Sequence, residues 1–122
     1  MYPTVEDKLR AAKTVHFFQG DRTITAMTAE GEMISVRPTF DGSGDVRAAV
    51  RDEVQVKRTR QYKVMTALGF RPIDRFWMLY KRETDKGVIK VRFYNSRIKE
   101  LLVNDIPVKH VSVEMGVSDE GA

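Results

Sequence analysis

Apolar and polar residues alternate with two different periods along the chain, and each period predicts a different kind of element. Val5, Leu9 and Ala12 share one helical face, which predicts a short helix over residues 5–13. The pattern then changes to alternation every second residue, interrupted by glycine-containing turns. It predicts three strands, over residues 14–19, 22–29 and 32–40.

A second helical region is indicated after the glycine-rich loop at residues 41–45. Val46, Ala49 and Val50 recur at helical spacing, whereas residues 54–57 alternate like a strand. The pattern therefore leaves open one long helix or two pieces joined by an extended segment. A helix resumes by about Arg60, and we expect it to end at Gly69, because glycine suits the left-handed conformation of a C-cap.

Two strand-like segments, residues 75–83 and 88–94, predict the best-defined hairpin of the chain. Two registers are possible for it. With a bulge at Gly87, Tyr80 and Arg82 lie on the exposed face of the sheet. With a four-residue loop over residues 84–87, the first strand turns over and Tyr80 points inward. In both registers the second strand directs Ile89, Val91 and Phe93 inward, and it directs Lys90, Arg92 and Tyr94 outward.

The C-terminal third predicts a short helix from Ser96 through Leu102, a last strand over residues 106–115 and a frayed acidic tail over residues 118–122. The predicted fold class is α+β. We expect a small single domain over residues 1–117, mainly antiparallel sheet (an N-terminal meander plus the central hairpin) with two to four helices packed on it.

Composition changes this picture only when the charge is divided along the chain. The 122 residues contain 21 Lys and Arg and 17 Asp and Glu, a net charge of +4. Residues 1–46 sum to −2, residues 47–99 to +10 and residues 100–122 to −4. A positive field concentrated in one segment is typical of proteins that bind a polyanion.

The positive segment also contains seven of the eleven aromatic residues. Nucleotide bases stack on exposed rings, for roughly 1–3 kcal/mol each, while cations follow the phosphates. Tyr94 is the first candidate for stacking and Tyr80 the second. The other candidate nucleic-acid-binding residues are cations of the helical region and of the hairpin: Arg47, Arg51, Arg58, Arg60, Lys63, Arg82, Lys90 and Arg92.

The sequence offers no set of residues for catalysis or for a cofactor. The histidines, His16 and His110, stand in separate strand-like segments without an obvious partner, and the chain has no cysteine. We therefore expect no zinc site and no other cofactor, and we favour a non-enzymatic function. The N-terminus lacks the apolar core of a signal peptide, and no apolar run is long enough to cross a bilayer. These features predict a cytoplasmic protein without a membrane partner.

Three functions remain open. The favoured one is a non-enzymatic accessory or regulatory protein that binds DNA or RNA, preferably single-stranded, through a basic and aromatic face in residues 47–99. The second is an assembly module for an acidic partner protein or for a second copy of the chain. The third is a small metal-dependent nuclease. Asp41, then Glu53 or Gln55, and then Lys57 resemble the PD-(D/E)xK arrangement, although Gln55 stands at the central acidic position and Glu53 is four residues before Lys57.

Overall fold

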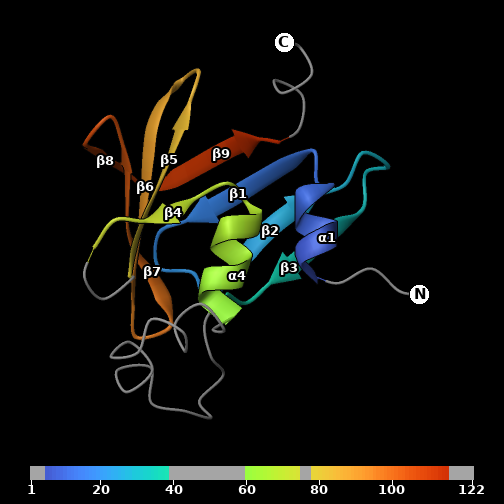
Figure 1. The fold of residues 1–122 in the computed structure, drawn as a ribbon, viewed down its shortest axis with the longest axis horizontal. Helices are drawn as coiled ribbons and strands as arrows, with labels where there is room; N and C mark the ends of the chain where they lie inside the picture. Colours follow the sequence, from blue (N-terminus) through green and yellow to red (C-terminus); the bar gives the residue numbers. More distant parts are fainter. Residues whose placement is uncertain (1–4, 39–59, 75–77, 116–122) are drawn as a thin grey trace.

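The strands of the described residues form two antiparallel sheets (Figure 1). The structure is a computed structural model that describes residues 5–38, 60–74 and 78–115. Sheet A has the order β3-β2-β1-β9. Its strands are β1 (Thr14–Phe18), β2 (Ile24–Met27), β3 (Met33–Val36) and β9 (His110–Glu114). Sheet B has the order β4-β5-β6-β7-β8. Its strands are β4 (Arg71–Pro72), β5 (Leu79–Thr84), β6 (Gly87–Tyr94), β7 (Arg97–Val103) and β8 (Ile106–Val108).

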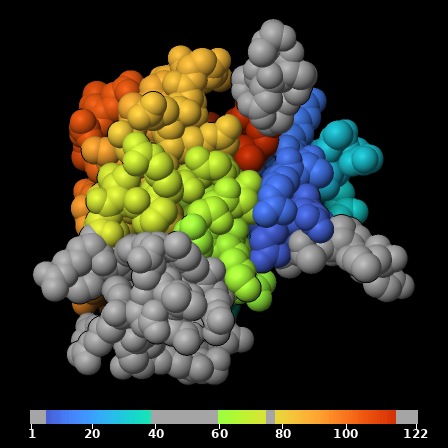
Figure 2. Space-filling view, in the orientation of Figure 1, coloured from blue at the N-terminus to red at the C-terminus, as the bar shows by residue number. Residues whose placement is uncertain are grey.

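The helices α1 (Val5–Arg10) and α4 (Arg60–Ala67) contact each other and lie against sheet A (Figure 1). In the space-filling view they adjoin at the surface, α1 in blue and α4 in green (Figure 2). Their apolar residues enter a core shared with both sheets, since Leu9, Val64 and Met65 are almost completely buried. The expected α+β class, dominated by antiparallel sheet, is confirmed. Neither of these described helices is long and apolar enough to span a bilayer.

The strict alternation of β1 decides which of its side chains reach the core. Val15 and Phe17 are fully buried, whereas His16 points to the opposite, outer face of sheet A. β9 repeats this pattern, with Val111 and Val113 buried. Because β1 lies between β2 and β9, the inner face of sheet A is a continuous apolar layer under the helices.

The predicted end of α4 at Gly69 is confirmed. Gly69 has a φ of 85°, and the Phe70 N–H donates to the Met65 carbonyl at 3.0 Å. This is the hydrogen bond of a Schellman cap, which needs a left-handed residue and therefore favours glycine. The earlier part of the predicted helical region, residues 45–59, lies outside the described residues.

The hairpin adopts the second of the two predicted registers. Glu83 faces Val88, and Thr84 faces Gly87 across the turn. The Thr84 hydroxyl donates to the Gly87 carbonyl at 2.8 Å, which closes this turn. The inward direction of Ile89, Val91 and Phe93 is confirmed, because all are at most 5% exposed.

Residues 97–103 form a strand rather than the predicted helix. The reason is a β-bulge: Arg92 pairs with Glu100 and Phe93 with Ile98, so that Lys99 is an extra residue on β7. The bulge lets Ile98 and Leu101 both face the core, although they are three residues apart. Their spacing therefore imitates the period of a helix. The turn before β7 consists of Asn95 and Ser96, with positive φ angles of 50° and 62°.

The predicted last strand, residues 106–115, is divided between the two sheets. β8 pairs with β7 in sheet B, whereas β9 pairs with β1 in sheet A. Lys109 stands between the two strands, and its carbonyl accepts a hydrogen bond from the Gln19 N–H at 2.9 Å. This crossing brings the β1–β2 turn close to β7.

Candidate nucleic-acid interface

The predicted binding residues of the helical region are only partly within the described structure. Arg47, Arg51 and Arg58 lie outside the described residues. Arg60 and Lys63 are on α4 and are exposed. They therefore remain available for contact with a ligand.

Tyr80 and Arg82 are exposed only in the bulged register, and the hairpin adopts the other register, in which β5 turns both side chains to the inner face. The Tyr80 side chain is completely buried and packs edge-to-face on Phe93, with ring centroids 5.9 Å apart. Its ring is therefore not available for base stacking. The Arg82 guanidinium donates to the Leu68 carbonyl at 2.8 Å, beyond the last turn of α4. Arg82 therefore caps the C-terminal end of α4 and does not lie on the outer face of sheet B.

Lys90 and Arg92 point outward as predicted, and each has a carboxylate partner. Lys90 Nζ lies 2.8 Å from Asp105 Oδ1, and Arg92 Nε lies 3.4 Å from Glu100 Oε1. The hydrogen bond from Lys90, together with its charge, lowers the pKa of the Asp105 carboxyl. A phosphate would have to compete with these carboxylates, so both cations are weaker ligands for a polyanion than their position suggests.

Tyr94 is the predicted residue that the structure places best for stacking. Its side chain is 49% exposed at the end of β6. The Lys99 ammonium lies 4.9 Å from the centroid of its ring, within the range of a cation–π contact. An exposed ring and a cation are therefore held together where β6 turns into β7.

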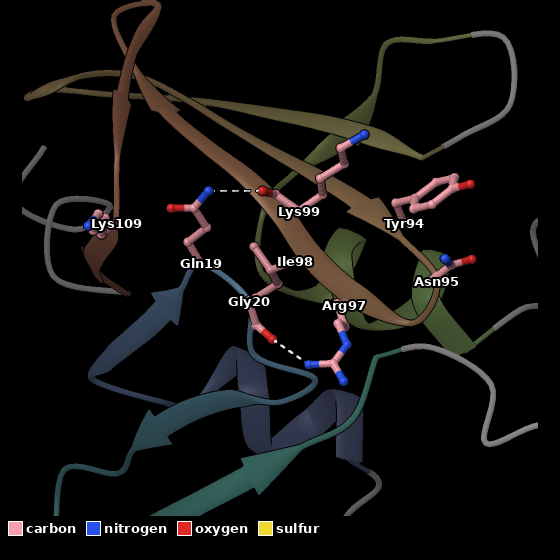
Figure 3. Close-up of a pocket in the computed structure, with 8 residues that line it drawn as sticks. All are labelled: Gln19, Gly20, Tyr94, Asn95, Arg97, Ile98, Lys99 and Lys109. Carbon is pink, nitrogen blue, oxygen red and sulfur yellow. Dashed lines mark hydrogen bonds between the residues drawn. The ribbon is translucent and has the colours of Figure 1, made fainter.

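An open pocket of about 670 Å³ adjoins this ring (Figure 3). We call it the basic pocket. Its lining residues come from the β1–β2 turn, from the β6–β7 hairpin and from the junction of β8 and β9: Gln19, Gly20, Tyr94, Asn95, Arg97, Ile98, Lys99 and Lys109.

Backbone hydrogen bonds build the pocket by docking the β1–β2 turn on β7. The Gly20 N–H donates to the Ile98 carbonyl at 2.7 Å, and the Ile98 N–H donates to the Asp21 carbonyl at 2.8 Å. These bonds occupy the edge of β7 beyond the residues that pair with β8. Gln19 Nε2 also donates to the Lys99 carbonyl at 3.2 Å (Figure 3). The turn is therefore fixed to β7 by both backbone and side chain.

The basic pocket is electropositive. Arg97, Lys99 and Lys109 contribute positive charge, and none of the described residues that line it is acidic. The Arg97 guanidinium donates to the Gly20 carbonyl at 3.3 Å, a neutral acceptor that leaves its charge uncompensated (Figure 3). Opposite charge from a ligand would therefore be stabilised here without first breaking an ion pair.

None of the three residues that make this pocket basic is among the predicted binding residues. Arg97 and Lys99 were in the positive segment but were assigned to a helix. Lys109 lies in the acidic C-terminal segment, and Gln19 lies in the N-terminal one. Their proximity depends on the crossing at Lys109 and on the docked turn, neither of which has a local sequence signal.

The histidines also differ from the prediction. His16 Nδ1 and His110 Nε2 lie 3.0 Å apart, so each is the partner of the other. Within the described part of the chain, no group of three or more His, Cys, Asp and Glu residues is placed to hold a metal ion. Asp41, Glu53, Gln55 and Lys57, which resemble a nuclease motif, lie outside the described residues.

No family model, no curated protein and no solved structure matches this chain.

Proposed function

We propose that this protein is a non-enzymatic nucleic-acid-binding protein with an accessory or regulatory role, and that single-stranded RNA or DNA is its preferred ligand. One observation carries the proposal. Arg97, Lys99 and Lys109 surround an open pocket beside the half-exposed ring of Tyr94, and no described lining residue is acidic.

Each part of this arrangement suits one part of a single-stranded nucleic acid. The cations attract phosphates, and a base without a pairing partner can stack on Tyr94 for roughly 1–3 kcal/mol. Lys99 stands over the same ring, so it can reach the phosphate next to a stacked base. A pocket of about 670 Å³ is in the usual range for small-molecule sites and has room for about one nucleotide.

The rest of the bound nucleic-acid chain would lie on the outer face of sheet B. Lys90 and Arg92 stand on this face, on the same strand as Tyr94. Their contribution is smaller because Asp105 and Glu100 already pair with them. We therefore place the main contacts in the basic pocket and the secondary contacts along β6.

Binding of labelled single-stranded RNA, single-stranded DNA and duplex DNA, measured by fluorescence anisotropy at several salt concentrations, tests the proposal. Arg97→Ala and Lys99→Ala should each weaken binding and reduce the slope of log K against log salt by about 0.7 for a single strand. Tyr94→Ala should weaken single-strand binding by about tenfold or more with a smaller change in slope.

Lys86→Ala is the matched control. It removes one positive charge from the β5–β6 turn, and β6 separates that turn from Tyr94 by about 24 Å. It should leave the affinity nearly unchanged. Absence of binding to all three nucleic acids at low salt would contradict the proposal. Equal binding to polyaspartate, unaffected by Tyr94→Ala, would instead favour an acidic protein partner.

A further inference from the structure

The outer face of sheet A carries a pair of histidines in direct contact. Phe18 on β1 faces His110 on β9, and His16 faces Ser112, so the two histidines are diagonal neighbours across the strands. His16 Nδ1 lies 3.0 Å from His110 Nε2, and the ring planes differ by 13°. The ring centroids are 5.2 Å apart, too far for face-to-face stacking. The imidazoles therefore meet edge to edge, with two ring nitrogens between them.

We propose that His16 and His110 form a binding site for one divalent transition-metal ion, with Cu²⁺ and Ni²⁺ preferred. Imidazole nitrogen is a good ligand for both ions. With metal–nitrogen bonds of about 2.0–2.1 Å, two nitrogens 3.0 Å apart subtend an angle of about 95° at the ion. This angle is close to that between neighbouring ligands in square-planar or octahedral coordination. It is narrower than the tetrahedral angle that Zn²⁺ prefers.

Metal binding replaces a proton that the two rings share. In the neutral pair, one facing nitrogen carries a hydrogen and donates it to the other. Both facing nitrogens need a free lone pair to bind the ion. The shared proton therefore moves to the far nitrogen of its own ring, His16 Nε2 or His110 Nδ1, and no proton is lost. Because the two facing nitrogens point at each other in the hydrogen-bonded pair, each ring must turn by roughly 40° before both lone pairs meet at one ion.

The neighbours of the pair hold it in place. The Phe18 ring stacks on the face of His110 with centroids 4.4 Å apart and planes 19° apart, which limits the tilting of that imidazole out of its own plane. The rigid ladder between β1 and β9 fixes the distance between the backbones. The two ligands are therefore already close together before the ion binds, which reduces the entropy that binding costs. No third His, Cys, Asp or Glu of the described residues joins the pair, so water would complete the coordination.

The test uses the full chain without an affinity tag. Isothermal titration calorimetry should give one Cu²⁺ or Ni²⁺ ion per chain, and each ion should raise the melting temperature, because a ligand of the folded state stabilises it. Mg²⁺, which prefers oxygen ligands, should have neither effect. His16→Gln and His110→Gln should each abolish both effects. Ser112→Ala, which changes a neighbour of His16 but keeps both imidazoles, should retain them.

A second measurement on the unmodified chain avoids dependence on variants that fail to fold. The chain has 2 histidines, so the carbon-bound ring protons of both can be followed by NMR. Paramagnetic Ni²⁺, added below one equivalent, should broaden the signals of both rings together. Broadening of neither ring or of only one would overturn the proposal. Unchanged ion binding in either folded His→Gln variant would overturn it as well.

Discussion

The Gln61 side-chain amide reaches from α4 into the core and donates a hydrogen bond to the Tyr80 hydroxyl at 3.4 Å. Tyr80 is fully buried and Gln61 is 7% exposed. The bond therefore links the helix to sheet B through buried polar groups. Burial raises the pKa of the Tyr80 hydroxyl to about 12. This contact fixes Tyr80 in the core as a structural residue, away from the outer face of sheet B.

Removal of the Tyr80 hydroxyl should cost stability. In Tyr80→Phe the ring still fills the core, but the Gln61 amide loses one acceptor in a buried place. We expect the free energy of unfolding, measured by urea denaturation, to fall by about 1 kcal/mol. Tyr94→Phe is the matched control, since its hydroxyl is on a half-exposed ring, and it should change stability by less than about 0.5 kcal/mol. Equal effects of the two substitutions would contradict this account.

Stability should also depend on Tyr80 at alkaline pH. Its pKa rises from 10.0 to about 12 on folding, so the folded state favours the neutral phenol. The stabilisation linked to this proton is complete below pH 10 and is lost as the pH rises through 12. The native chain should therefore lose more stability than Tyr80→Phe over this interval. Parallel curves of unfolding free energy against pH would refute the prediction.

Arg82 and Arg92 lie on opposite faces of one hairpin and should behave differently on truncation. Arg82→Ala removes a charge-assisted hydrogen bond to Leu68 and should lower the free energy of unfolding by about 1–2 kcal/mol, with little change in nucleic-acid affinity. Arg92→Ala breaks an exposed ion pair and should change stability by less than about 1 kcal/mol while it weakens binding. Urea denaturation and anisotropy on both variants check this contrast, and a reversed pattern would disprove it.

Ser96→Gly should stabilise the protein. Ser96 has a φ of 62° at the second position of the β6–β7 turn, a conformation in which glycine has no side-chain penalty. We expect a gain of about 0.5–1 kcal/mol in the free energy of unfolding. Ser112→Gly provides the comparison, because it introduces glycine within β9 and should cost about 0.5–1 kcal/mol. A loss of stability in both variants would contradict the turn assignment.

Glu100→Gln should increase nucleic-acid affinity. Glu100 Oε1 lies 3.4 Å from Arg92 Nε, and both side chains are about 40% exposed, so the ion pair contributes little to folding. Its removal frees Arg92 for a phosphate, and the salt slope should steepen by about 0.7 for a single strand. Anisotropy titrations at several salt concentrations measure both quantities. Unchanged affinity would mean that Arg92 does not contact the ligand.

Several features follow from local chemistry and were therefore predictable from the sequence. Gly69 ends α4 because the C-cap needs a left-handed residue. Ile89, Val91 and Phe93 point inward because side chains alternate along a strand, whichever register the hairpin adopts. The antiparallel α+β class follows from the same periodicities. The concentration of positive charge in residues 47–99 is likewise a property of the sequence alone.

Other features depend on which distant segments pair, and only the tertiary structure decided them. The bulge at Lys99 exists because β6 and β7 pair with one extra residue, and this made a strand resemble a helix. The register of β5 decided that Tyr80 and Arg82 face the core side. Lys109 joins Arg97 and Lys99, and His16 meets His110 across 94 positions, because β9 pairs with β1. Local periodicity reports on each strand separately, whereas these contacts arise from long-range pairing of strands.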